Sequence, residues 1–453
     1  MSDFLTKIKR FILYAGDVIL LYGVLAIVLM LRYGGLSAHV WQIHFWPFSI
    51  MFALWLLTFY ISGLYDPRLT KNDINFYTLI FKTLALVGGI GMVYFYISSS
   101  RLFSIRPFIV FFVYLAIFSV LFLFWRRFYN HLTETQTFRS NVLFIGGGQD
   151  MDNLIAELNR KPHLGYHVAE RIFEAENFQN HTLGDFDLKK LLTEKRIDTV
   201  VTSLELHRLP EIVSQFYKNL FLGISYFDLP TFYERVLGKI PVTTIGQMWF
   251  LENISEGEKR FYEIFKRISD ILISLILGIA GLLLTPFIAL AIKLDSKGPV
   301  LFKQNRVGRG GQIFRAMKFR SMVVGAEKNG AQWATANDPR ITRVGRFLRK
   351  SRLDEIPQLL NVLRGEMSFV GPRPERPEFV EELKKKIPFY DERHLIKPGL
   401  TGWAQVNFKY GASENDALEK LQYDLYYIKN RSILLDLGIA LKTINIVLSG
   451  KGQ

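Results

Sequence analysis

The stretch "EKRFYEIFKRISDILISLILGIAGLLLTPFIALAIKLDSKGP", residues 258–299, decides the fold because it joins an amphipathic segment to a long apolar one. Its first part places large apolar side chains at helical spacing: Phe261, Ile264, Phe265 and Ile268. This pattern is typical of a helix that lies in the headgroup plane of a membrane. From Ile271 to Leu294 the chain is almost continuously apolar, which indicates contact with the hydrocarbon.

Pro286 interrupts the apolar run. A proline inside a helix removes one backbone hydrogen bond and clashes with the preceding turn, so we expect a kink there, with the Thr285 hydroxyl helping to satisfy the freed carbonyls. Two geometries are open: a helix that crosses the membrane, and a re-entrant helix over about 268–294 that returns to the same face. Residues 295–453 hold 28 Lys and Arg against 17 Asp and Glu, which favours the re-entrant geometry.

Four earlier apolar stretches each approach the length needed to cross a membrane: Phe11–Leu31, His44–Leu64, Ile74–Ile97 and Pro107–Trp125. We therefore predict four transmembrane helices within residues 1–130. The short connections differ in charge, with Lys7, Lys9, Arg10, Arg68, Lys71, Arg126 and Arg127 on one side and Arg32, Arg101 and Arg106 on the other. The positive-inside rule then puts the N-terminus and everything after Arg126 in the cytoplasm. Asp17 within the first span either marks a polar pathway or, as we favour, lies near the interface or bonds another helix.

The composition supports a membrane protein. The chain has 453 residues, 38 Phe, a formal net charge of +15 and no cysteine. The missing cysteines exclude disulfides and thiolate chemistry. The positive charge alone would also suit nucleic acid, so its position along the chain decides its meaning.

Residues 139–246 change to an α/β pattern. "NVLFIGGG" (141–148) reads as a buried strand entering a glycine turn, and "DTVVTS" (198–203) and "GISYFDLP" (223–230) read as further strands. Gly146 and Gly148 supply only half of a dinucleotide-binding motif, because the third position is Met151. We favour a structural Rossmann-like domain over a nucleotide-binding one.

Residues 298–322 predict a hairpin with its turn at Gly308 to Gly311. Lys318 and Arg320 share a face of the second strand by two-residue alternation. Because these cations, and the arginines of "RITRVGRFLRKSRL" (340–353), lie beside a membrane segment, phosphorylated small molecules or anionic headgroups suit them better than nucleic acid.

Asp354 and Glu355 stand together at the start of a predicted helix over 355–364, with Asp354 at the N-cap and Gly365 at the C-terminal end. Adjacent helical residues point about 100° apart, so the two carboxylates should do different jobs. We expect the helix dipole and the nearby cations to keep both ionised. A structural N-cap is one interpretation; a nucleophile toward phosphorus or a ligand for Mg²⁺ is the other.

Arg373 favours the second interpretation. Two prolines flank it in "GPRP" (371–374), and a guanidinium fixed in a stiff loop is a good clamp for phosphate oxygens. Carboxylates, a hard cation and preset Arg and Lys side chains together indicate phosphoryl transfer at a membrane.

These residues also carry a resemblance. "KFRSM" (318–322), "RLDEIPQLLNVLRGEMSFVGPRP" (352–374) and "KPGLTGWAQV" (397–406) are similar to motifs of the bacterial sugar transferase family, the monotopic phosphoglycosyl transferases. The resemblance covers roughly residues 258–453, and the segments before it resemble the long-form members. It implies three parts: four transmembrane helices, a Rossmann-like α/β domain, and an α+β catalytic domain with a re-entrant membrane helix.

The resemblance implies a reaction in which a UDP-hexose, with glucose or galactose as the sugar, gives hexose-1-phosphate to undecaprenyl phosphate and releases UMP. It implies that Asp354 is the nucleophile and carries a covalent phosphosugar, that Glu355 helps to hold Mg²⁺, and that Lys318, Arg320 and Arg373 serve the phosphates. Thr285 and Pro286 match the break of the re-entrant helix. Such enzymes start exopolysaccharide or O-antigen synthesis on the cytoplasmic face of the bacterial inner membrane. A homodimer is open, and nucleic acid is not an expected partner.

Two other classes of protein remain as alternative interpretations of the sequence. Membrane-anchored nucleotide-sugar dehydratases join apolar spans to a Rossmann domain, and Tyr262 and Lys266 have the spacing of their catalytic pair. A non-catalytic assembly scaffold would use its cationic domain only to bind anionic lipid. Release of UMP from a UDP-sugar would exclude the scaffold, and tight binding of NAD would favour the dehydratase.

Overall fold

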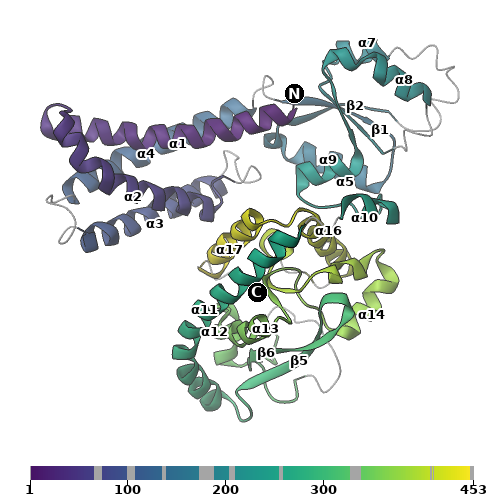
Figure 1. Ribbon diagram of the computed structural model, residues 1–453. Coiled ribbons are helices and arrows are strands. Elements are labelled where there is room, and N and C mark those ends of the chain that lie inside the picture. Colours follow the sequence, from purple (N-terminus) through teal and green to yellow (C-terminus); the bar gives the residue numbers. More distant parts are fainter. Residues whose placement is uncertain are drawn as a thin grey trace. The chain divides into compact units, whose positions relative to one another are not determined.

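The computed structural model describes residues 2–65, 74–98, 108–134, 139–172, 188–203, 210–254, 259–326, 338–408, 411 and 413–448 (Figure 1). The chain divides into two compact units, Met1–Phe232 and Tyr233–Gln453.

The N-terminal unit begins with long apolar helices: α1 (Ser2–Tyr33), α2 (Ala38–Ser62), α3 (Ile74–Ser98) and α4 (Phe108–Glu134). Each is long and apolar enough to cross a membrane, as the sequence predicts. Large aromatic side chains fill the space between them, with Trp55, Phe59, Tyr114, Phe118 and Phe122 fully buried. Rings stacked this way contribute more than their buried area alone.

Asp17 is the polar centre of these helices. Its carboxylate pairs with Arg126 of α4 at 2.6 Å and accepts hydrogen bonds from Tyr65 and the Trp125 indole. Asp17 therefore bonds another helix, which was one of the two expectations. The guanidinium of Arg126 is buried in this pair, so Arg126 is not a loop cation. Four other cations of the orientation argument, Arg68, Lys71, Arg101 and Arg106, lie outside the described residues.

A four-stranded parallel sheet completes the N-terminal unit, with the order β2-β1-β3-β4. Its elements are β1 (Ser140–Ile145), α5 (Gln149–Arg160), β2 (Tyr166–Ile172), α7 (Leu188–Glu194), β3 (Thr199–Thr202), α8 (Pro210–Lys218) and β4 (Ser225–Asp228). α7 and α8 pack on one face of the sheet through Leu192 and Phe216 (Figure 1). The predicted parallel α/β domain is thus present, and β2 is a strand that the sequence pattern did not reveal.

The C-terminal unit is a mixed domain with small sheets and many short helices. Its elements are the end of α9 (Leu229–Leu237), α10 (Gln247–Asn253), α11 (Arg260–Asp295), β5 (Leu301–Val307), η6 (Arg309–Gly311), β6 (Ile313–Phe319), α12 (Arg343–Lys350), η7 (Leu353–Gln358), α13 (Leu359–Arg364), β7 (Ser368–Val370), α14 (Pro377–Lys386), η8 (Tyr390–Leu395), β8 (Gly399–Thr401), α15 (Trp403–Asn407), α16 (Glu414–Asn430) and α17 (Ile433–Leu448). β5 and β6 form the predicted antiparallel hairpin.

The boundary between the units falls earlier than the sequence pattern suggested. Ile240, Val242 and Ile245 pack into the main core of the C-terminal unit with Leu421 and Leu425 of α16. The Ile240 amide also donates to the carbonyl of Gln422. Residues 233–246 are therefore part of the C-terminal unit and not of the Rossmann-like domain.

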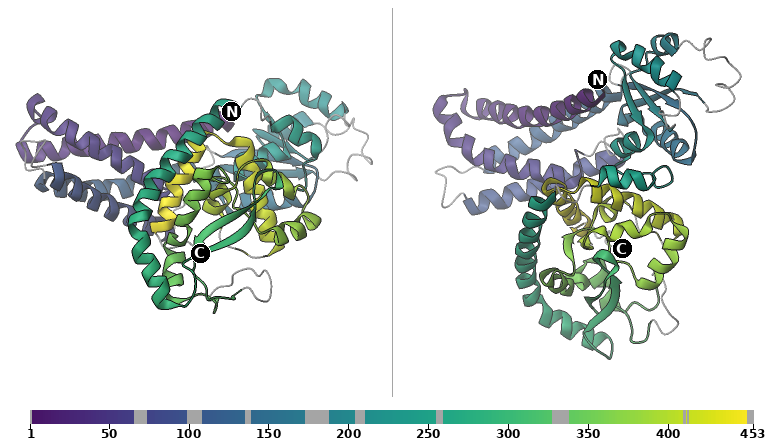
Figure 2. Two further views of the ribbon diagram at one scale, coloured as in Figure 1. Left: turned by 60° about the horizontal axis from the view of Figure 1, so that its bottom comes forward. Right: turned by 45° about the vertical axis from the view of Figure 1, so that its right-hand side comes forward.

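Helix α11 contains the stretch quoted first. It runs unbroken for 36 residues with Pro286 inside it, and both views in Figure 2 show that it changes direction along its length. The Thr285 hydroxyl donates to the Gly281 carbonyl at 2.9 Å, one residue before the Leu282 carbonyl that Pro286 leaves without its amide donor. One stripe of α11 is buried against the domain: Asp270, Ser274, Gly281, Ile288 and Ile292. The opposite face exposes large apolar side chains, including Leu283 and Phe287.

We predict that Asp17→Ala lowers the melting temperature of the detergent-solubilised chain strongly, because it leaves the Arg126 charge buried without its carboxylate. Breaking one partner of a buried pair costs about 3–5 kcal/mol. The double variant Asp17→Leu/Arg126→Met removes both charges and should recover most of the loss. A double variant as unstable as the single one would show that the pair itself is not what holds the helices.

Candidate functional site

The acidic pair lies on a short 3₁₀ turn, η7, between α12 and α13. Asp354 and Glu355 are 5% and 9% exposed. The turn is entered through Arg352 in the left-handed conformation, with a φ of 57°. The sequence pattern predicts Asp354 as the N-cap of an α-helix, and the structure shows that this prediction is wrong. Pro357 explains the difference, because it cannot donate a backbone hydrogen bond and disfavours the α conformation at Ile356, so α13 starts only at Leu359.

Helix α11 holds this turn in place. Leu353 and Ile356 pack against the cluster that contains Ile288 and Ile292 of α11. Gly281 permits the close approach, because a Cβ at that position would lie 2.6 Å from Cγ2 of Ile356. The two carboxylates are thereby fixed beside the long apolar helix α11.

Glu355 is surrounded by cations. Its Oε1 lies 3.0 Å from Lys318 Nζ, 3.0 Å from Arg373 Nη2 and 3.4 Å from Arg352 Nη1. Burial alone would raise the pKa of Glu355, but Lys318, Arg373 and Arg352 together hold it well below its usual range. Glu355 is therefore a permanent anion that keeps three cationic side chains in one place.

Asp354 has a different environment. Its Oδ1 is buried and accepts no hydrogen bond from any described residue. Burial raises the pKa of Asp354, although Lys318 opposes the shift. The pKa shifts of the two carboxylates therefore have opposite directions, and the expectation that both are ionised stays a prediction. The expectation that the two side chains have different roles agrees with these surroundings.

Lys318 reaches the site from the hairpin. Its strand β6 is attached to α13 by the buried side chain of Asn361, which accepts from the Met317 amide and donates to the Arg315 carbonyl. Lys318 is thereby held at the end of the strand with its ammonium group on Glu355.

Arg320 does not join this cluster. Its Nη2 donates to the carbonyl and the hydroxyl of Ser296, at 2.7 and 3.0 Å, at the C-terminal end of α11. Strand β6 ends at Phe319, so two-residue alternation no longer applies to Arg320. In this structure Arg320 caps α11 and does not lie with the predicted phosphate ligands.

Arg373 does lie where the sequence placed it, in the loop after β7, with its guanidinium on Glu355. Besides the two prolines, the buried side chain of Arg393 fixes this loop by donating to the Arg373 carbonyl at 3.1 Å. Arg393 is itself held by Asp424 and by the Tyr390 hydroxyl. Arg393 is far from Arg373 in sequence, so no local pattern predicts that it positions Arg373.

Arg352 and Arg393 are the residues that sequence reasoning missed at this site. Arg352 belongs to the cationic run before the acidic pair, but its contact with Glu355 depends on the left-handed turn. Non-glycine residues adopt that conformation rarely, so it could not be read from the pattern.

A divalent metal would find few protein ligands here. Within the described ranges, no group of three or more His, Cys, Asp or Glu side chains could hold a metal ion. Mg²⁺ in phosphate enzymes commonly binds one or two carboxylates together with substrate phosphates. Two carboxylate oxygens fit that mode, Asp354 Oδ1 and Glu355 Oε2, because neither accepts a hydrogen bond from the part of the chain described. Glu355 Oε1 does not fit it, because three cationic side chains already bind that oxygen.

The alternative catalytic pair has other partners. The Tyr262 hydroxyl and Lys266 Nζ both bind Asp436, at 2.9 and 2.8 Å. The geometry therefore gives no support to a dehydratase that uses Tyr262 and Lys266.

Comparisons with known proteins identify the family of the chain. Residues 261–450 match the family described as bacterial sugar transferase, and residues 60–219 match a family described as CoA-binding domain. The chain is 35% identical to a UDP-glucose:undecaprenyl-phosphate glucose-1-phosphate transferase of Xanthomonas campestris pv. campestris, over 72% of this chain and 70% of that protein. The chain belongs to the bacterial sugar transferase family.

Two further relatives match a smaller part of this chain. A UDP-N-acetylgalactosamine-undecaprenyl-phosphate N-acetylgalactosaminephosphotransferase of Aeromonas hydrophila is 50% identical over 42% of this chain and 45% of that protein. A UDP-glucose:undecaprenyl-phosphate glucose-1-phosphate transferase of Escherichia coli (strain K12) is 45% identical over 40% of this chain and 39% of that protein. In these two comparisons the chain covers less than half of the relative.

We predict a pH-dependent loss of stability from His394, which is buried next to Arg393. Burial, with the charge of Arg393, lowers the pKa of His394 to about 4. In the unfolded chain His394 takes up a proton near pH 6.5, whereas in the folded chain it stays neutral until the pH approaches 4. The stability that neutral His394 contributes is therefore complete above pH 6.5 and is lost as the pH falls toward 4. By pH 5 the loss should reach about 2 kcal/mol.

Thermal unfolding of the native chain and of His394→Gln between pH 7.5 and 5 measures this contribution. The native chain should lose more stability on acidification than the variant does. Asp391→Asn is the matched control, because the Asp391 carboxylate lies 3.7 Å from the His394 ring. Parallel pH profiles of the native chain and His394→Gln would refute the prediction.

Proposed function

We propose that this protein transfers hexose-1-phosphate from a UDP-hexose to undecaprenyl phosphate, releases UMP, and begins the membrane stage of exopolysaccharide or O-antigen synthesis. The observation that carries the proposal is the buried Oδ1 of Asp354, which has no hydrogen-bond partner among the described residues and lies next to a glutamate that gathers three cations. The names of the relatives supply the acceptor and the class of donor.

The first half of the reaction uses Asp354 as a nucleophile. One carboxylate oxygen attacks the phosphorus that bears the sugar, the bond from that phosphorus to the bridging oxygen breaks, and UMP leaves with the electron pair. The raised pKa of Asp354 makes its carboxylate more basic, which favours attack. The product is an acyl phosphate on Asp354 that retains the hexose.

The second half returns the phosphorus to a lipid. An oxygen of undecaprenyl phosphate attacks the same phosphorus, and the Asp354 carboxylate leaves. The attacking oxygen is already anionic, so no general base is needed. One diphosphate linkage replaces another, which keeps the free-energy change of the overall reaction small. His394 is the single histidine after residue 207, and its low pKa suits a structural role.

Lys318, Arg352 and Arg373 neutralise the phosphates. Glu355 holds their three charged groups together before any substrate arrives, so little reorganisation is required when the diphosphate binds. Mg²⁺ held by Glu355 and the diphosphate would stabilise the charge that develops on the leaving UMP.

Helix α11 supports a re-entrant placement in the cytoplasmic membrane. Near its N-terminus Arg267 donates to the carbonyls of Val362 and Leu363, and at its C-terminus Ser296 accepts from Arg320. Both ends are therefore fixed to the same domain, while the face with Leu283 and Phe287 stays exposed. A domain that holds both ends of a helix stays on one side of the bilayer, and cytosolic nucleotide sugars place that side in the cytoplasm.

Intact-protein mass spectrometry tests the covalent step. After incubation with UDP-glucose, UDP-galactose or UDP-N-acetylgalactosamine, the native chain should gain the mass of one sugar phosphate with its own donor. Asp354→Asn should gain nothing, and Asp391→Asn, an exposed aspartate of the same domain, should react like the native chain. An adduct of equal yield on Asp354→Asn would assign the nucleophile to another residue.

A matched pair of hairpin variants separates chemistry from stability. Lys318→Gln should form the adduct about 100-fold more slowly, because it removes a preorganised cation from the reacting phosphate. Arg320→Gln should instead lower the melting temperature, because it uncaps α11, and folded Arg320→Gln should react at the native rate. Slow chemistry in folded Arg320→Gln would return that residue to the phosphate site.

A further inference from the structure

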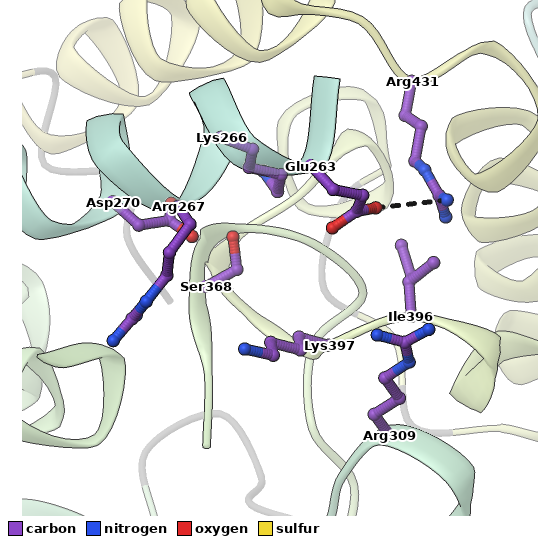
Figure 3. A pocket seen from close by; sticks show the side chains of 9 residues that line it. All are labelled: Glu263, Lys266, Arg267, Asp270, Arg309, Ser368, Ile396, Lys397 and Arg431. Atoms are coloured by element: carbon purple, nitrogen blue, oxygen red, sulfur yellow. Dashed lines mark ion pairs between the residues drawn. The ribbon is translucent and has the colours of Figure 1, made fainter. Parts of the chain in front are cut away.

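A second cationic pocket lies in the C-terminal unit, away from the acidic pair. It is lined by Glu263, Lys266, Arg267, Asp270, Arg309, Ser368, Ile396, Lys397 and Arg431. Figure 3 shows these side chains coming together from α11, from the hairpin turn and from the segment before β8. Five of the nine residues are cations and two are acids.

The pocket and the acidic pair adjoin opposite ends of α13. η7, which bears Asp354, precedes α13, whereas Arg267 binds the last carbonyls of α13 and Lys397 Nζ lies 3.5 Å from where a Cβ of Gly365 would be. Six helical residues separate the two places, or about 9 Å along the axis. The reaction proposed above does not use this pocket.

Part of the pocket's charge is already balanced. Lys266 pairs with Asp436 at 2.8 Å, and Arg431 pairs with Glu263 at 3.2 Å. The Asp270 carboxylate accepts from the Phe369 amide. Two of the cations are thus paired with carboxylates, whereas the charge of Asp270 is not balanced by an ion pair among the described residues.

Three cations of the pocket form no ion pair with any described residue, and the Asp270 carboxylate is the pocket acid that opposes their charge. Arg267 donates to two neutral carbonyls, and neither Arg309 nor Lys397 forms an ion pair with any residue that the structure describes. Burial, reinforced by the charge of Arg267, lowers the pKa of Lys397. Like charges held this close are costly unless an anion joins them. Arg267 already caps α13, so helix capping does not account for Lys397 and Arg309.

The position of the pocket on α11 indicates which anion. Glu263, Lys266, Arg267 and Asp270 follow helical spacing and form the pocket face of the helix. Phe261, Ile264, Phe265 and Ile268 follow the same spacing on another face and are all exposed. A helix with exposed apolar side chains in these turns lies at the headgroup level, where the abundant anions are lipid phosphates.

We infer that this pocket binds the phosphate group of a membrane lipid through Arg267, Arg309 and Lys397. The inference rests on the proposed function for the membrane placement of α11. Two lipids offer this chemistry: the polyprenyl phosphate acceptor, which would wait here before reaching Asp354, and an anionic phospholipid, which would anchor the domain.

Binding can be measured without turnover. The full-length chain, in dodecyl maltoside micelles that contain phosphatidylcholine, is titrated with undecaprenyl phosphate, phosphatidylglycerol or inorganic phosphate, and the melting temperature is followed. We expect saturable stabilisation by at least one of the two lipids. Lys397→Gln and Arg309→Gln should each weaken it about 10-fold, as expected for loss of one charge-assisted hydrogen bond.

The controls keep each result interpretable. Arg309 is exposed on the hairpin turn, so Arg309→Gln should fold normally even if Lys397→Gln does not. Lys385→Gln removes an exposed lysine of α14 and should bind like the native chain. Asp354→Asn should also bind normally, so a failure of the covalent chemistry remains distinguishable from a failure of this site.

Comparing the stabilisation by the two lipids identifies which lipid supplies the bound phosphate group. Stabilisation by undecaprenyl phosphate beyond that by phosphatidylglycerol would assign an acceptor site, and equal stabilisation by both would assign an anchoring site. Stabilisation by inorganic phosphate alone would overturn the inference, and so would lipid binding that Lys397→Gln and Arg309→Gln leave unchanged.

Discussion

The contact between α11 and the acidic turn is the constraint on which the C-terminal unit depends. One face of this helix must be apolar enough for lipid, while the stripe with Gly281 and Ile288 must fit a folded domain. Ile356 meets the helix at Gly281, next to the two carboxylates. An apolar helix with an exposed face thus forms the floor of a polar site, which suits the proposed transfer between a water-soluble donor and a lipid acceptor.

The two neighbouring carboxylates have different electrostatic environments. Glu355 is stabilised as an anion by three cations, and it in turn holds those cations in place without a substrate. Burial raises the pKa of Asp354, and its Oδ1 accepts no hydrogen bond from the described residues. The same chain segment therefore holds two carboxylates in different electrostatic environments, and the difference comes from which cations reach each side chain.

Much of this arrangement could be predicted, and the misses share a cause. The apolar helices, the parallel sheet, the hairpin and the positions of Lys318 and Arg373 follow from period and spacing, which are local properties. Arg320 was misplaced because alternation stops where β6 ends, and Asp354 was misread as a cap because Pro357 delays α13. The roles of Arg352 and Arg393 depend on a rare backbone conformation and on contacts distant in sequence.

The sequence by itself determined which segments are apolar enough to meet lipid, which residues could handle phosphate, and the family to which the chain belongs. Only the tertiary structure decided that Asp17 pairs with Arg126, that three cations converge on Glu355, and that a second group of cations gathers beside Gly365. The hydrophobic period of a segment is a property of its local sequence. The partner of a buried charge depends on which segments meet in space, because its energy comes from distance and burial and not from sequence neighbours.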